Sequence, residues 1–132
     1  SQNIGGFGGY MVKSILTNCY SRSTVMGAGY AGGLLGYNHT GTIQYCYAAG
    51  NVSCPANAGG LLGFNDQGTL VAAYWDATAT TQAASHGSES SFGKTTQEMR
   101  AGSTFEKWDF NSVWAIRETL DYPWLQAVPE HP

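Results

Sequence analysis

The sequence predicts an all-β fold: a parallel β-helix (β-solenoid) of about three 27-residue coils, followed by a small aromatic-rich C-terminal cap with one short helix. Residues 32–38 read GGLLGYN and residues 59–65 read GGLLGFN, in register and without an insertion between them. Each copy is too short to bury its apolar face alone, so neighbouring copies must stack on one another. Glycine interrupts each copy every few residues, which disfavours a helical repeat and leaves short β-forming runs bounded by turns.

The middle copy fits one coil of a β-helix, with strands expected at residues 34–37, 42–48 and 51–53. Equivalent residues of successive coils then lie about 4.8 Å apart in columns. Two interior columns are expected, one of Leu16, Ile43 and Leu70 and one of Leu34 and Leu61. Glycine suits the corners, and asparagine suits turns where amides hydrogen-bond from coil to coil. The residues that define the repeat are Gly33, Leu34, Gly36, Asn38, Gly41, Gly60, Leu61, Gly63, Asn65 and Gly68.

A degenerate first copy, GGFGGY, occupies residues 5–10, so repeats are expected at about 5–31, 32–58 and 59–76. The pattern stops at the segment YWD, and charged residues become frequent after it. We therefore expect a three-coil solenoid over residues 1–76 and a loop and cap over residues 77–132.

The C-terminal region reads as a loop, a short helix and an apolar tail. Residues 77–92 are rich in Ala, Thr and Ser, which favours a loop. The following Thr95-Thr96-Gln97-Glu98 is a capping box and predicts a short helix over about 96–101. The tail carries six large aromatic residues: Phe105, Trp108, Phe110, Trp114, Tyr122 and Trp124. We expect this tail to pack on the last coil as a plug over its open edge, because an uncovered coil end promotes aggregation.

The repeat resembles the GLUG-motif family, named for Gly-Leu-any-Gly. Residues 33–36 and 60–63 both read GLLG, and the segments CYS at 19–21 and CYA at 46–48 extend the match. Further motifs shared with the family follow, namely YWD, GKTT, EM, WDF, VW and YP, so the resemblance spans nearly the whole chain. It implies a bacterial or archaeal exported protein, such as a filamentous-haemagglutinin-like adhesin, another surface protein or the non-catalytic region of an IgA-cleaving protease. It supplies no catalytic residues.

Composition excludes several partners. The net charge of −3 and the pI of about 5.4 leave no clustered basic face for nucleic acid. There is no run of 18 apolar residues, so no membrane-spanning helix is expected. Only 11% of residues are charged, against about 25% in an average soluble domain, which is typical of secreted and surface repeat proteins.

No catalytic, cofactor or metal site is predicted. The segment Gly93-Lys94-Thr95 mimics the end of a P-loop, but Ser88 stands where that motif needs glycine. A glycosidase needs two acids on one face, and Asp66 is the only acid before Asp76. Calcium at Asn65, Asp66 or Asp76 lacks regularly spaced oxygen ligands. The remaining candidates, scattered along the chain, are His39, His86, His131 and Asp109.

Three sets of residues have more than one interpretation. The sequons at Asn38 and Asn51 are candidate glycosylation sites. Cys19, Cys46 and Cys54 lack a metal-ligand spacing and form either one disulfide with a free thiol or three buried thiols. Tyr30, Tyr37 and Tyr45 form either a carbohydrate-stacking surface or, as we favour, aromatic ladders that stabilise the coils.

The function we expect is a non-enzymatic structural or adhesive module, extracellular or on the cell surface. The first coil begins with Gly5 and Gly6 and shows no N-terminal cap, so either upstream coils or another subunit should cover it. The module is then either the end of a surface adhesin or a subunit that stacks into a filament. The alternative is a module that binds a glycan or host surface through the side of the solenoid.

Overall fold

The computed structural model describes residues 3–27, 29–54, 57–82, 85, 92–105, 107–117, 119 and 121–126, and every structural statement below concerns these residues. Their fold is all-β, with short strands in parallel sheets up to Asp76 and then two short 3-10 helices and a β-ribbon. This confirms the all-β, parallel-strand part of the predicted fold class. Within the same part of the chain, no helix has the length and apolar character needed to cross a membrane.

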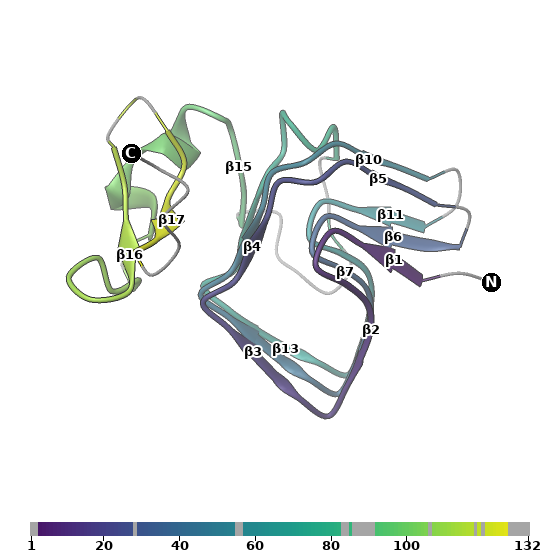
Figure 1. Ribbon diagram of the computed structural model, residues 1–132. Coiled ribbons are helices and arrows are strands. Elements are labelled where there is room, and N and C mark those ends of the chain that lie inside the picture. The colour runs from purple at the N-terminus through teal and green to yellow at the C-terminus, as the bar shows by residue number, and fades with distance from the viewer. Residues whose placement is uncertain are drawn as a thin grey trace.

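The chain winds through successive turns that lie on one another, so that strands far apart in sequence run side by side (Figure 1). The strands of the first turn are β1 (Asn3–Gly5), β2 (Gly8–Val12), β3 (Ile15–Thr17), β4 (Tyr20–Ser21) and β5 (Val25–Met26). Those of the second are β6 (Tyr30–Gly32), β7 (Leu35–His39), β8 (Thr42–Gln44), β9 (Tyr47–Ala48) and β10 (Val52–Ser53). Those of the third are β11 (Asn57–Gly59), β12 (Leu62–Asp66), β13 (Thr69–Val71) and β14 (Tyr74–Asp76).

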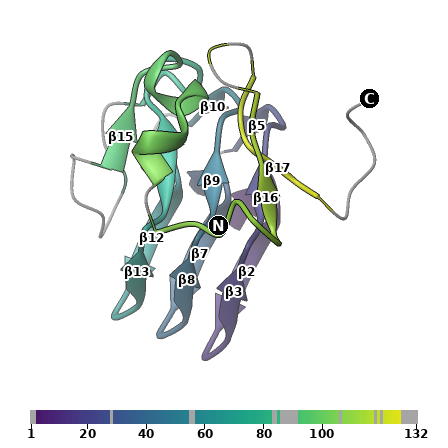
Figure 2. The ribbon, with the colours of Figure 1, turned by 90° about the vertical axis from the view of Figure 1, so that its left-hand side faces the viewer.

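Paired residues in neighbouring turns are separated in sequence by the length of the repeat. Asn38 pairs in parallel with Asn65, 27 residues further along, and Met11 pairs with Asn38 in the same way. Figure 2 shows β3, β8 and β13 side by side in this order, as their pairing requires. The stacked parallel turns are consistent with a β-solenoid.

The middle turn contains five short strands, where three were expected. The expected run over 42–48 is split at Tyr45, whose φ of 56° is a left-handed conformation that ends β8 and redirects the chain into β9. Strand β6 was missed because its glycine lowers the β propensity of the segment. That glycine, Gly32, lies in a tight corner, where a Cβ atom would come within 2.1 Å of the carbonyl oxygen of Leu35.

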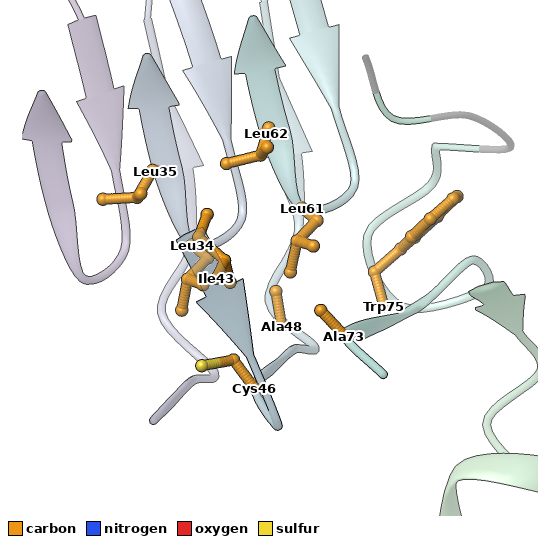
Figure 3. Close-up of a cluster of buried hydrophobic side chains, with 9 residues drawn as sticks. All are labelled: Leu34, Leu35, Ile43, Cys46, Ala48, Leu61, Leu62, Ala73 and Trp75. Carbon is orange, nitrogen blue, oxygen red and sulfur yellow. The ribbon is translucent and has the colours of Figure 1, made fainter. Parts of the chain in front are cut away.

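The interior of the stack is a core of aliphatic and small side chains (Figure 3). Leu34, Leu61 and Ile43 are fully buried, as their columns predict. Leu16 and Leu70, in the outer turns, are only partly buried and pack against this core, because each has a neighbouring turn on one side only. The buried residues of the core are Leu34, Leu35, Ile43, Cys46, Ala48, Leu61, Leu62, Ala73 and Trp75.

The aromatic tail lies against the side of the stack, so the predicted plug over the edge of the last coil is wrong (Figure 2). Tyr20, Tyr47 and Tyr74 form one outward-facing column across the three turns. The ring centroid of Tyr20 lies 5.8 Å from that of Trp114, and the ring centroid of Tyr47 lies 6.1 Å from that of Trp108, both tryptophans being in the tail. The tail packs sideways because this column offers aromatic surface from every turn, whereas the end of the stack offers only one.

The end of the last turn is covered instead by the segment that precedes the tail. Strand β15 (Gly93–Lys94) pairs in parallel with β14 and extends its sheet by one strand. The hydroxyl oxygen of Ser85 accepts a hydrogen bond of 2.8 Å from the backbone N–H of Leu62. The carbonyl of Thr80 accepts a hydrogen bond of 3.1 Å from the backbone N–H of Val52. The chain therefore satisfies much of this end itself.

The capping box forms as predicted. The backbone N–H of Thr95 donates to the carboxylate of Glu98 at 2.9 Å, and the backbone N–H of Glu98 donates to the hydroxyl of Thr95 at 3.1 Å. The helix it starts is a 3-10 turn, η2 (Glu98–Arg100), which is shorter than expected, and a second 3-10 helix follows as η3 (Gly102–Phe105). The ribbon of the tail consists of antiparallel β16 (Trp114–Ala115) and β17 (Trp124–Leu125).

Candidate functional site

The first turn presents an unpartnered edge, and we call it the open edge. Strands β1 to β5 each pair with one other strand among the described residues, so no described strand lies along their second edge. The large apolar side chains most exposed in the same part of the chain all belong to this turn: Phe7 (54%), Tyr10 (54%), Val12 (45%), Ile15 (70%) and Met26 (72%). Large apolar side chains exposed to this extent mark the first turn as a candidate interaction site.

Three of these apolar residues replace polar residues of the later turns. Ile15 pairs with Thr42, Val12 with His39 and Met26 with Ser53. The apolar character is therefore a property of the first turn and not of the repeat. Sequence inspection overlooked these three residues, although their departure from the polar columns was visible in the aligned copies.

The asparagine ladder also ends at the open edge. The side-chain N–H of Asn38 donates to the carbonyl of Gly41 at 3.1 Å and to Oδ1 of Asn65 at 2.9 Å. Its own Oδ1 is buried and has no hydrogen-bond partner. The residue one rung earlier in this column is Met11, whose side chain has no N–H to donate. A buried acceptor is thus left unsatisfied next to the first turn.

The predicted tyrosine surface divides between two places. Tyr37 is the middle ring of a stacked ladder, with centroids 5.1 Å from Tyr10 and 5.2 Å from Phe64, and Tyr30 packs against its edge. Tyr45 packs instead against the aromatic tail cluster. The faces of Tyr37 are occupied by its neighbours, so the ladder that we favoured from the sequence forms.

A small polar cluster lies beside this ladder. The carboxylate of Asp66 accepts hydrogen bonds from the hydroxyl of Tyr37 at 2.9 Å and meets Nδ1 of His39 at 2.8 Å. These contacts, first that with His39 and then that with Tyr37, lower the pKa of Asp66. The three side chains link the second and third turns on the outer face.

The other acid of interest, Asp76, is fully buried and engaged by four donors. Its Oδ1 accepts from the backbone N–H groups of Thr78 and Ala79, at 2.9 and 2.8 Å. Its Oδ2 accepts from the hydroxyls of Thr96 at 2.7 Å and Tyr122 at 2.6 Å. This arrangement joins the last turn to the tail and leaves no position of the carboxylate for a ligand.

The remaining candidate residues do not assemble into a reactive site. Lys94 lies in β15 and Thr95 caps the following turn. Asp109 accepts hydrogen bonds from two backbone N–H groups of its own loop. His86 and His131 lie outside the described residues. Among the residues that are described, no three His, Cys, Asp or Glu side chains group in a way that could hold a metal ion.

The three cysteines are free thiols, so the disulfide interpretation is not supported. Cys46 is buried, whereas Cys19 and Cys54 are half-buried. The thiol of Cys46 hydrogen-bonds to Cys19, which lowers the pKa of Cys19 to about 7, and the same contact with burial raises that of Cys46.

The two sequons differ in accessibility. Asn38 is fully buried, and its amide nitrogen donates two hydrogen bonds. Asn51 is exposed, and its side-chain oxygen accepts a hydrogen bond from Thr81 at 3.1 Å. Glycosylation stays a prediction at both sequons, and Asn51 is the more accessible of the two.

Stacked turns of one sequence period define the molecule as a repeat protein. Residues 27–53, the span of the middle turn, match the family model Glug, described as the GLUG motif. The middle turn is thus a GLUG repeat, which confirms the resemblance seen in the sequence. Neither a search of curated proteins nor a search of solved structures gave a match.

Proposed function

We propose that this chain is a non-enzymatic structural or adhesive module of an exported protein, located outside the cell or on its surface. In this proposal the module is a β-solenoid of three 27-residue coils, and its open edge receives a further coil. The observation that carries the proposal is the confinement of exposed apolar side chains to the first turn. The GLUG match supports the repeat character and the extracellular, adhesin-like class.

A further coil suits the open edge better than an unrelated partner. A further coil would extend the five parallel strand stacks in their existing register and so place a second strand beside each of β1 to β5. The asparagine of the added coil, however, would lie next to Met11. The buried Oδ1 of Asn38 therefore gains no hydrogen-bond donor from the new coil. The occupant therefore contributes mainly backbone pairing and apolar contact.

Two sources of that coil are compatible with the proposal: more repeats ahead of this module in a surface adhesin, or a second copy that stacks end to end. The covering of the last turn favours the first source. Strand β15 occupies the rung beyond β14, and Ser85 hydrogen-bonds the start of β12. A second copy approaching that end would have to displace both.

The test adds one copy of residues 32–58 directly ahead of Gly5. We expect the longer chain to have a higher free energy of unfolding in urea and to remain monomeric in sedimentation analysis. The matched control adds the same residues in scrambled order, which should leave stability unchanged. An authentic extra coil that does not stabilise the chain contradicts the proposal.

The two sources are separated by the self-association of the unmodified chain. If the upstream-coil version is right, concentrated protein should form at most small, irregular oligomers, and replacing Ile15 and Met26 by the polar residues of their columns should remove them. Regular filaments in negative stain would instead favour end-to-end stacking.

Binding of a glycan through the side face remains the alternative function. Its weakness is that the ladder rings at Tyr37 stack on each other, so that they present edges more than faces to a sugar ring. Glycan-array binding that is lost in Tyr37→Ala but retained in Tyr45→Ala would favour this alternative over the structural role.

A further inference from the structure

A cavity of about 380 Å³ opens where the last turn meets the segment that covers it. Its walls come from β14, β15 and η3 and from residues next to these elements. The residues that line it are Ala72, Tyr74, Phe92, Lys94, Ser103, Thr104 and Lys107. None of these residues belongs to the open edge, although Tyr74 also pairs with Tyr47 of the middle turn.

The cavity concentrates positive charge in an acidic protein. The chain has only 6 Lys and Arg residues against 9 acids, yet two lysines, Lys94 and Lys107, line this one cavity. Among the described residues, no ion pair joins either ammonium group to a carboxylate. The nearby acid Glu98 is engaged in the capping box with Thr95. An anionic group entering the cavity therefore meets two cations and no acid among the residues that line it.

The other walls are suited to a small polar ring. Tyr74 and Phe92 supply an aromatic wall, held in place by an edge-to-face contact with centroids 5.4 Å apart. Ser103 and Thr104 supply hydroxyl groups from η3, and the hydroxyl of Thr104 is itself positioned by a 2.6 Å hydrogen bond to the carbonyl of Glu98. Aromatic surface beside hydroxyls and a charge is the chemistry that holds a sugar ring and fixes its orientation.

We propose that this cavity binds an acidic sugar residue, with its anionic group between Lys94 and Lys107 and its ring against Tyr74 and Phe92. The cavity volume lies at the lower end of the range of small-ligand sites, which fits one or two sugar units. The site goes beyond the stacking role: it lies away from the open edge, and binding there does not depend on what covers the first turn.

The test is a titration of the monomeric chain followed by NMR chemical shifts, at low ionic strength. The probes are glucuronate and N-acetylneuraminate for a carboxylate, galactose 6-sulfate for a sulfate ester, and galactose as the neutral sugar. We expect saturable shifts at the cavity residues with the acidic sugars and none with galactose. Whichever acidic probe binds most tightly identifies the source of the anion.

Matched variants locate the site. Lys94→Gln and Lys107→Gln should each weaken binding about tenfold, the effect of losing one charge-assisted hydrogen bond. Lys13→Gln removes the same charge from the first turn and should leave binding unchanged. Equal losses in all three variants would indicate general charge attraction and overturn the proposal.

Two further outcomes also overturn it. If sodium sulfate displaces the sugars at equal concentration, the cavity holds an anion only and the sugar ring contributes nothing. If acidic sugars shift only residues of the Tyr37 ladder, the glycan site lies on the side face instead. Either result leaves the stacking proposal untouched, because the extra-coil experiment measures unfolding and not sugar binding.

Discussion

Phe7 and Leu61 occupy the same column of the repeat, but Phe7 in the first turn is 54% exposed while Leu61 in the last is fully buried. The contrast extends to the hydrogen bonds of the two ends. The last turn has its backbone covered by β15 and Ser85, and its acid, Asp76, is engaged by four donors. At the first turn the strands have a free edge, and Asn38 beside it lacks a donor.

The difference teaches that burial in this molecule is decided by neighbours more than by residue type. A turn in the middle is covered on both sides by copies of itself, so its apolar residues need no special partner. An end turn needs another segment in place of the missing neighbouring copy. At the last turn the chain supplies this covering segment itself. At the first turn it exposes apolar side chains, so the two ends differ in how they are covered.

The largest effect is expected from removing the ring that closes the last turn. Trp75 is fully buried, packs over Gly60 and donates a 2.8 Å hydrogen bond to the carbonyl of Gln82. We expect Trp75→Ala to lower the free energy of unfolding by about 3–5 kcal/mol. Phe7→Ala, at the other end, should cost less than about 1 kcal/mol because the ring is already exposed. Urea unfolding followed by circular dichroism measures both, and equal losses would contradict the asymmetry.

The second effect concerns the buried carboxylate. Asp76→Ala leaves two backbone N–H groups and the hydroxyls of Thr96 and Tyr122 without their acceptor, so we expect a loss of about 2–4 kcal/mol. Asp109 also accepts two backbone hydrogen bonds, but it is exposed, and Asp109→Ala should cost less than about 1 kcal/mol. A comparison of the two unfolding curves separates burial from the loss of an acid as such.

Sequence inspection could predict what is periodic or local. The repeat period placed Leu34 and Leu61 in one interior column, and the spacing of Thr95 and Glu98 was enough for the capping box. It could not predict the position of the tail. Aromatic density indicates that the tail is buried, but its contact with Tyr20 is set by a long-range choice between the side and the end of the stack.

The candidate site was predictable in part for the same reason. That Ile15 lies at a column of threonines could have been read from the aligned copies, since the exchange of an exposed polar residue for an apolar one marks an interface. The cavity at Lys94 could not be predicted from the sequence, because its walls come from separate segments that only the fold brings together.

A third effect, smaller than the first two, is expected at alkaline pH. Burial, and then the hydrogen bond to Asp76, raise the pKa of Tyr122 from 10.0 to about 12. A group whose pKa is raised by folding contributes stability that is complete below its unfolded value. We therefore expect stability to fall between pH 10 and about 12, as the unfolded chain loses this proton and the folded chain keeps it. The contribution is about 1 kcal/mol after allowance for solvent screening of a half-exposed group.

Tyr122→Phe isolates that contribution. The variant is less stable at neutral pH because it lacks the hydrogen bond to Asp76, but its stability should decline less steeply over the same pH interval. Urea midpoints measured at several pH values give the slope. Parallel slopes in the two proteins would show that other groups cause the alkaline loss.

The smallest effect has the opposite sign and acts at the open edge. Met11→Asn would place an amide N–H one rung before Asn38, whose buried Oδ1 has no donor. The same amide is positioned to reach the carbonyl of Ser14, as Asn38 reaches that of Gly41. We expect a gain of about 1 kcal/mol, the net value of satisfying a buried acceptor less the lost apolar contact. Met11→Asp has the same shape but brings a second acceptor, so it should destabilise the chain. If the Asn and Asp variants are equally stable, the missing donor is not what limits the first turn, and the two ends differ only in their apolar cover.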